Sequence, residues 1–152
     1  MSDDVKVVAT NRKAFHDYEI LDKVEAGISL RGSEIKSIRA GQVNLREGYI
    51  SIEQQQAWLL NVNISPYDPA NRMNHDPLRR KKLLLHRKEI VRLQAAQQQK
   101  GLAIIPLRLY LKHGLAKVEI ALARGLRKYD KRQVLAKKDA EREMRRMMST
   151  KR

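Results

Sequence analysis

The residues of this sequence that are best suited to binding a ligand form two clusters of Lys and Arg. The last twenty-nine positions, Arg124 to Arg152, hold twelve of the chain's 32 Lys and Arg residues and four acidic residues. The second cluster is the run of four cations from Arg79 to Lys82. Cations at this density neutralise phosphates and release the counterions condensed on them, which is a main source of affinity for nucleic acids. Both clusters therefore predict contacts with phosphate.

The rest of the composition limits the class of partner. A formal net charge of +15 over 152 residues favours RNA, DNA or an anionic membrane. A membrane-surface protein needs a broad apolar face, which one Trp and one Phe do not supply. No run of about 20 apolar residues predicts a membrane span, and the acidic N-terminus does not resemble a signal peptide. We expect a soluble, cytoplasmic protein that does not bind membranes.

The sequence offers weak support for catalysis. The chain has no Cys, which excludes disulfides, thiolate metal sites and thiol chemistry. Its four His residues lack metal-ligand spacing, and no phosphate-binding Gly-rich loop occurs. Glu25 and Glu34 are nine residues apart across a turn, which leaves an acid–base pair and an RNA-modifying enzyme open as an alternative. On a basic surface, however, carboxylates more often accept hydrogen bonds from Arg or from bases. We expect no catalytic residue, metal or cofactor.

Alternating apolar residues predict a mainly β body that positions the basic side chains. The expected strands cover residues 18–30, 43–52, 57–65, 83–85, 107–111 and 118–122. The first strand should bulge or bend at Glu25–Gly27. The last two strands meet at His113-Gly114, and Leu107, Leu109 and Leu111 should share one apolar face.

Short helices are expected between these strands. Asn11 is positioned to cap a helical turn, residues 33–40 form a helix that ends at Gly41, and a third helix runs from about Arg87 to Lys100. In this third helix, Ile90, Val91, Leu93 and Ala96 form the expected buried stripe. Residues 66–77 contain three of the four prolines and predict a long loop. The pattern as a whole indicates a small closed β-barrel of the OB type with two or three short helices.

The expected organisation is a barrel over residues 1–124 and a basic tail over residues 125–152. Ala136, Ala140, Met144 and Met147 share one helical face in the tail, but that stripe is too short to hold a helix alone. We therefore expect a tail that is disordered when free and helical on an anionic surface. Tyr67, Tyr110 and Tyr129 are candidates for stacking on bases.

Four segments carry a resemblance to a known family. NRKAFHDYEI, EAGISLRGSEIKSIRAGQVNL, DPLRRKKLLLHRKEI and YDKR occur in this order between Asn11 and the C-terminus. Through them the chain strongly resembles the tmRNA-binding protein (small protein B) family of bacterial trans-translation. The resemblance implies an OB-like barrel that binds the tRNA-like domain of tmRNA and enters stalled ribosomes. It also implies a non-enzymatic adaptor that delivers alanyl-tmRNA together with elongation factor Tu. We expect it to act as a monomer.

The resemblance also implies roles for particular residues. Glu25, Leu84 and Lys117 match family residues implicated in tmRNA binding, and Lys36, Ser37 and Arg39 fall on the same proposed RNA face. The complete set expected to bind RNA comprises Glu25, Lys36, Ser37, Arg39, Arg79, Arg80, Lys81, Lys82, Leu84, Lys117 and Arg124.

In the tail, the motif Tyr129–Arg132 matches family residues needed for tagging after delivery, where the tail probes the decoding site and the empty mRNA channel of the small subunit. The residues expected to contact the ribosome are Arg127, Lys128, Tyr129, Asp130, Lys131, Arg132, Lys137, Lys138, Arg142, Arg145 and Arg146. Two positions depart from the family pattern, because Tyr129 stands where His is frequent and Leu126 stands where Lys is common. A ribosomal or rRNA-binding module with a threading tail is the alternative function.

Overall fold

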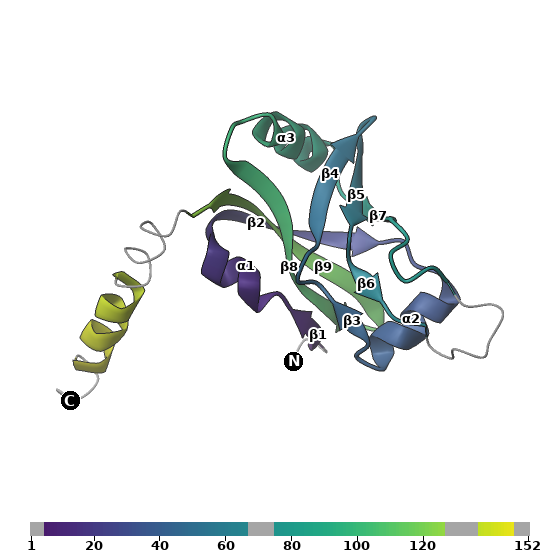
Figure 1. Ribbon diagram of the computed structural model, residues 1–152, viewed down its shortest axis with the longest axis horizontal. Coiled ribbons are helices and arrows are strands. Elements are labelled where there is room, and N and C mark those ends of the chain that lie inside the picture. Colours follow the sequence, from purple (N-terminus) through teal and green to yellow (C-terminus); the bar gives the residue numbers. More distant parts are fainter. Residues whose placement is uncertain (1–4, 67–74, 127–136, 148–152) are drawn as a thin grey trace.

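A strongly curved antiparallel sheet forms the body of the protein (Figure 1). The computed structural model describes residues 5–66, 75–126 and 137–147. Within these residues, seven strands pair in the order β1-β8-β9-β2-β7-β5-β4, and β3 pairs with β6. The strands are β1 (Val5–Thr10), β2 (Tyr18–Ile28), β3 (Val43–Asn44), β4 (Tyr49–Glu53), β5 (Gln56–Leu60), β6 (Asn63–Ile64), β7 (Lys81–Leu84), β8 (Leu102–Lys112) and β9 (Leu115–Gly125).

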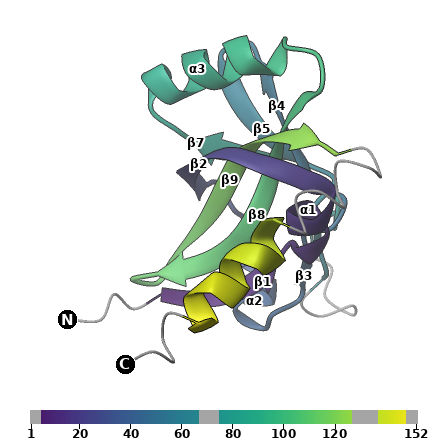
Figure 2. The same ribbon diagram turned by 90° about the vertical axis from the view of Figure 1, so that its left-hand side faces the viewer.

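Three helices accompany the sheet. They are α1 (Arg12–Asp17), α2 (Gly32–Arg39) and α3 (Arg87–Gln97), and α2 and α3 lie at opposite ends of the curved sheet (Figure 1, Figure 2). The predicted cap of α1 is confirmed, because the Asn11 Oδ1 accepts a hydrogen bond from the Ala14 N–H at 3.2 Å. The Asn11 amide also donates to the Pro106 carbonyl oxygen at 2.9 Å. This buried side chain therefore fastens α1 onto β8.

The prediction of a closed barrel is wrong, because β1 and β4 are unpaired edges of an open sheet among the described residues. One edge of β8 pairs with β9. Over Arg108–Lys112 the other edge pairs with β1, so this part of β8 does not pair with β4. The outer edge of β4 is covered by α3 instead. The Gln97 Oε1 of this helix accepts the hydrogen bond from the Ile52 N–H at 2.9 Å, which replaces a strand partner.

Bulges place apolar residues on both sides of the sheet. The register of β8 against β9 shifts between Pro106 and Arg108, so Leu107 packs under α1, whereas Leu109 packs in the main core inside the curve. The expected common face of these two residues is therefore wrong. The bulge in β2 lies between Ile20 and Asp22 rather than at Glu25–Gly27. A bulge reverses the alternation of side chains, and the apolar pattern alone does not locate it.

Two expected strands are each interrupted. Residues 43–52 divide into β3 and β4, and residues 57–65 divide into β5 and β6, with Asn61 at a positive φ of 61° between the latter two. The interruption at Asn61 reverses the alternation of buried and exposed side chains. Leu59 and Val62, which are three positions apart, are therefore both buried, while Trp58 is half-exposed. In α3, Leu93 and Ala96 are buried as predicted, but Val91 is 58% exposed.

The body ends one residue beyond β9. The Leu126 N–H donates to the Asp17 carbonyl oxygen at 3.0 Å, which fixes the start of the tail against α1. Residues 137–147, which we expected to be disordered in the free chain, form a helix, and all of them are exposed. Ala, Glu, Lys, Arg and Met favour helix locally. An isolated helix of this length is nonetheless marginal in water.

A buried ionic network joins α2 to β7. The fully buried Glu34 accepts two hydrogen bonds from Arg79, at 2.6 and 3.1 Å, and one from the Arg31 N–H at 2.7 Å. The fully buried Lys81 donates to the Val62 carbonyl oxygen at 2.8 Å. Three cationic or N–H donors thus surround one carboxylate and bring distant segments of the chain together.

The surroundings of Glu34 and Lys81 lower the pKa values of both side chains. Burial alone would raise the pKa of Glu34, but the hydrogen bonds from Arg79 and Arg31 and the charges of Arg79 and Lys81 outweigh burial and hold the pKa below 4.5. Burial lowers the pKa of Lys81 to about 8, partly opposed by the charge of Glu34. Glu34 therefore stays ionised throughout the neutral range.

We predict that Glu34→Gln destabilises the protein at pH 7 by about 3–5 kcal/mol, because it leaves Arg79 and Lys81 without their counter-ion. A depressed pKa contributes stability that is present above pH 4.5 and is lost as the pH falls through the folded-state pKa. The wild type should therefore lose more unfolding free energy below pH 4.5 than Glu34→Gln does, as measured by urea denaturation. The control is Glu53→Gln, since Glu53 and its partner Arg80 are both 57% exposed; we expect a change below about 1 kcal/mol. Equal effects of the two substitutions would contradict the network.

Candidate RNA-binding surface

Strand register brings three predicted site residues to one side of the sheet. Tyr110 of β8 lies opposite Lys117 of β9, which lies opposite Gly27 of β2, and Gly27 lies opposite Leu84 of β7. Glu25 is two residues from Gly27 and shares its side. We call this surface, defined by Glu25, Gly27, Leu84, Tyr110 and Lys117, the open face. It lies on the outside of the curve, because the alternate residues of these strands fill the main core.

An exposed leucine and a glycine form the apolar part of the open face. Leu84 is 55% exposed, which is unusual for a leucine in a central strand. A Cβ at Gly27 would lie 3.2 Å from the Leu84 Cβ, so a larger residue at Gly27 would crowd this side chain. The glycine therefore leaves a low floor beside an apolar pad, which suits the flat surface of an unstacked base.

Charged and polar groups surround this floor. The Tyr110 hydroxyl donates a hydrogen bond to the Glu25 Oε2, and the Lys112 Nζ lies 3.7 Å from the same oxygen. Burial, followed by the hydrogen bond and charge of Glu25, raises the pKa of Tyr110 well above its usual range. The phenol is therefore a permanent donor. Because its ring is only 9% exposed and its hydroxyl is engaged, Tyr110 is poorly placed for the predicted stacking on a base.

A groove of about 510 Å³ adjoins the open face. Leu84 and Lys117 line it from the sheet, and Arg39 lines it from α2. These three residues come from distant parts of the sequence, and the structure brings them together as expected for one binding surface. Lys36 is also exposed on α2 but is not part of the groove lining.

The expected role of Ser37 in RNA contact is corrected by the structure. Ser37 is fully buried, and its Oγ donates to the Ser65 carbonyl oxygen at 2.6 Å. Ser37 and the adjacent Ile38 are both buried on the side of α2 that packs on the core. The Ser37 side chain therefore holds α2 to the segment after β6.

The basic run from Arg79 to Lys82 divides between two environments. Arg80 and Lys82 are exposed, and the Arg80 guanidinium stacks on the Trp58 ring at 4.1 Å from its centroid. Arg79 binds Glu34 and is 25% exposed, so its expected phosphate contact stays a prediction. Lys81 is fully buried and donates to the Val62 carbonyl oxygen, so its expected phosphate contact is wrong. Side chains in an extended segment alternate between its two sides, and charge alone does not reveal which side is buried.

Arg124 lies away from the open face. Arg124 is exposed, and its Nη1 is 3.6 Å from the Glu19 Oε2. It is seven residues from Lys117 along β9, which is about 23 Å in an extended strand. Among the expected ribosome contacts, those on the exposed helix are Lys137, Lys138, Arg142, Arg145 and Arg146. Arg127, Lys128 and the motif Tyr129–Arg132 lie outside the described residues, as does Tyr67.

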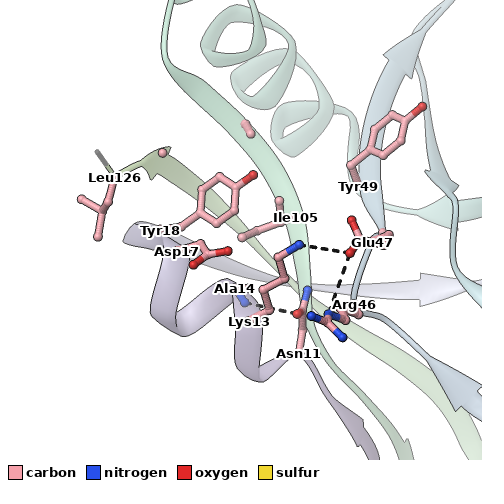
Figure 3. A pocket seen from close by; sticks show the side chains of 13 residues that line it. Asn11, Lys13, Ala14, Asp17, Tyr18, Arg46, Glu47, Tyr49, Ile105 and Leu126 are labelled. Atoms are coloured by element: carbon pink, nitrogen blue, oxygen red, sulfur yellow. Dashed lines mark hydrogen bonds and ion pairs between the residues drawn. The ribbon is translucent and has the colours of Figure 1, made fainter. Parts of the chain in front are cut away.

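A second pocket lies where the tail leaves the body. It has a volume of about 580 Å³ and is formed by α1, by the loop between β3 and β4, and by Leu126 (Figure 3). The Lys13 Nζ donates to the Glu47 Oε1 at 3.0 Å, and the Arg46 Nε lies 3.9 Å from the same oxygen. One carboxylate thus compensates two cations beside the start of the tail.

The proposed pairing of Glu25 with Glu34 as an acid–base site is not supported by their contacts. Glu25 is bound to Tyr110 on the open face, whereas Glu34 is enclosed by Arg79 and the Arg31 N–H. Within residues 5–66, 75–126 and 137–147, no group of three or more His, Asp or Glu side chains is arranged to hold a metal ion. None of the helices described there has the length and apolar character of a membrane span.

Sequence reasoning did not identify three features of this surface: the bond between Tyr110 and Glu25, the floor at Gly27, and the stacking of Arg80 on Trp58. The alternation of residues 107–112 and 115–122 indicated a polar side on each strand. Tyr110 and Glu25 are 85 residues apart on β8 and β2, which β9 joins, so the pairing of all three strands decides that they meet, and no local signal reports it.

Comparisons with known proteins agree over nearly the whole chain. The SmpB protein family model matches residues 8–150. An SsrA-binding protein of Sulfurihydrogenibium sp. is 58% identical over 139 residues, which are 91% of this chain and 91% of that protein. An SsrA-binding protein of Desulfitobacterium hafniense is 54% identical over 145 residues, which are 95% of this chain and 93% of that protein.

A solved structure extends this agreement to the fold. A chain in the structure described as "tmRNA-SmpB: a journey to the center of the bacterial ribosome" is 44% identical, with a TM-score of 0.69, and the match covers 85% of this chain and 94% of that chain. The resemblance carried by the four sequence motifs is thereby confirmed. Because family model, relatives and fold agree in this way, the chain belongs to the SmpB protein family.

Proposed function

We propose that this protein is an RNA-binding adaptor of trans-translation that binds the tRNA-like domain of tmRNA and brings it to stalled ribosomes. Relatives that share more than half of their residues with it are SsrA-binding proteins. The solved chain with a similar fold comes from work on tmRNA-SmpB and the bacterial ribosome. The observation on this chain that carries the proposal is the convergence of Glu25, Leu84 and Lys117 on the open face, beside the groove that Arg39 lines.

The chemistry of the open face supports contact with a folded RNA. Lys117 and Arg39 offer cations to phosphates, and the exposed Arg80 and Lys82 extend this charge along β7. Leu84 and Gly27 offer an apolar floor to a base that has left its stack. Phosphate contacts position such a complex, and contacts to bases specify it. The open face therefore takes the tRNA-like domain.

The tail has a separate task in this proposal. It starts at Leu126, at the end of β9 opposite to Lys117, so RNA on the open face leaves the tail's point of departure accessible. The exposed basic helix at residues 137–147 suits the rRNA around the decoding site and the empty mRNA channel. We propose that the tail probes these sites while the protein, as a monomer, acts with elongation factor Tu and alanyl-tmRNA.

Deleting residues 129–152 should leave affinity for the tRNA-like domain largely unchanged and abolish tagging of the nascent peptide, because the two surfaces act separately. Filter binding measures the affinity, and a reconstituted translation system with a stalled ribosome measures tagging. The matched variant Leu84→Asp keeps the tail but places a charge on an exposed position of the open face; it should lose both activities. Loss of RNA affinity in the truncated protein equal to that of Leu84→Asp would contradict the division of tasks.

Arg80→Gln and Lys82→Gln should each reduce the slope of log Kobs against log salt by about 1, because each removes one phosphate contact. The wild type, with six to ten such contacts, should lose about 10³- to 10⁵-fold in affinity between 50 and 200 mM salt. Lys81→Met is the matched control in the same strand, since Lys81 is buried. Its salt slope should equal that of the wild type, and a reduced slope would refute the assignment of Lys81 to the interior.

The helix at residues 137–147 should be only partly populated in the free protein, since it has no packed face. Circular dichroism of the full chain minus that of the truncated chain should therefore show a weak helical signal. Binding of the tail to small ribosomal subunits should restrict the motion of this helix, as measured by the mobility of a spin label on a cysteine introduced at position 141. A fully formed, rigid helix in dilute buffer would count against this expectation.

A further inference from the structure

Glu25 is held by one carboxylate oxygen and open at the other. Both of its contacts, the hydrogen bond from the Tyr110 hydroxyl and the approach of the Lys112 Nζ at 3.7 Å, use Oε2. Within the described residues, no donor approaches Oε1. The Glu25 side chain is 43% exposed, whereas Tyr110 is 9% exposed. A buried phenol thus orients a partly exposed carboxylate whose second oxygen has no hydrogen bond among the described residues.

The fold gains little stability from a carboxylate at this position. Glu25 lies directly opposite Glu119 in the β2–β9 register, and like charges at opposed positions destabilise a sheet. The Glu119 Oε1 is buried without a hydrogen-bond donor, and the nearest cation, the Arg108 Nε, is 3.6 Å away. The arrangement is better explained by a ligand that uses Glu25 than by packing.

We propose that Tyr110 is a positioning residue that fixes Glu25 so that its Oε1 accepts hydrogen bonds from both the N1–H and the N2 amine of a guanine of the bound RNA. This inference rests on the proposed function, since it names what the open face reads in the tRNA-like domain. The guanine lies on the floor formed by Gly27 and Leu84, with its Watson–Crick edge toward Glu25 and its phosphate toward Lys117.

The chemistry of the bases selects guanine. An ionised carboxylate accepts hydrogen bonds and donates none. Guanine presents two adjacent donors on its Watson–Crick edge, the ring N1–H and the N2 amine. In adenine and cytosine the ring nitrogen beside the amine is an acceptor, so its lone pair faces the carboxylate and repels it. Uracil presents one N–H between two carbonyl oxygens. A carboxylate held at a fixed angle therefore discriminates for guanine.

The first test compares the affinities of the full-length protein and its variants for the transcribed tRNA-like domain of tmRNA. Tyr110→Phe should weaken binding about 5- to 30-fold, because it releases Glu25 without removing it. The same substitution should have no further effect in a Glu25→Gln background, since its effect passes through Glu25. Tyr49→Phe, at an exposed tyrosine of the second pocket, is the matched control and should bind as the wild type does.

A second test identifies the base. Guanosines of the RNA are replaced at random by inosine, which lacks the N2 amine, and interference with binding is mapped. One guanosine should show interference with the wild type and none with Tyr110→Phe or Glu25→Gln. Three results would overturn the inference. They are an unaltered affinity of Tyr110→Phe, effects of Tyr110→Phe and Glu25→Gln that multiply in the double variant, and inosine interference that persists in Glu25→Gln. Failure of the wild type to bind the RNA would instead overturn the proposed function itself.

Discussion

The register of β2, β7, β8 and β9 is the constraint on which the rest of the structure depends. Successive side chains of a strand point to opposite sides, so a slip of one residue would move every outward residue of that strand into the core. The main core fixes the pairing because Val24, Ala26 and Ile28 must point inward. With that pairing fixed, Glu25 and Gly27 must point outward beside Lys117 and Leu84.

The bulges extend the same constraint along the sheet. In β8 the extra residue at Leu107 returns Ile105 to the outside, where α1 covers it, while Arg108 and Tyr110 on the same side are not part of the apolar cluster under α1. In β2 a bulge beside Leu21 has the same effect against β9. One side of the sheet thus carries an apolar patch under α1 and a polar, accessible area next to it.

The buried network of Glu34, Arg79 and Lys81 joins two elements that line the groove, α2 and β7. It ties α2, which carries Arg39, to the segment leading into β7, which carries Leu84. Removing one member leaves buried charges unpaired, so the network is a strong constraint on how these segments fit together. Contacts inside the body therefore fix the lining of the groove. The helix at residues 137–147, by contrast, is exposed along its whole length.

Local chemistry explains what the sequence alone determined about this protein. Cationic clusters, period-two apolar strands, the Asn11 cap and the turn at His113-Gly114 follow from charge, alternation and backbone preference, all of which act between near neighbours. They sufficed for a basic, mainly β protein with a helical cap at Asn11, and the motifs sufficed for its family.

Tertiary structure alone decided which of these residues meet. Arg79 and Lys81 have the same charge as Arg80 and Lys82, yet they turn inward, where Arg79 binds Glu34, 45 residues away, and Lys81 binds the Val62 carbonyl oxygen. β1 pairs with β8 over Arg108–Lys112, and Gln97 of α3 binds the outer edge of β4 at Ile52. The position of a bulge and the partner of a buried charge are set by contacts between distant segments, and no periodicity along the chain encodes them.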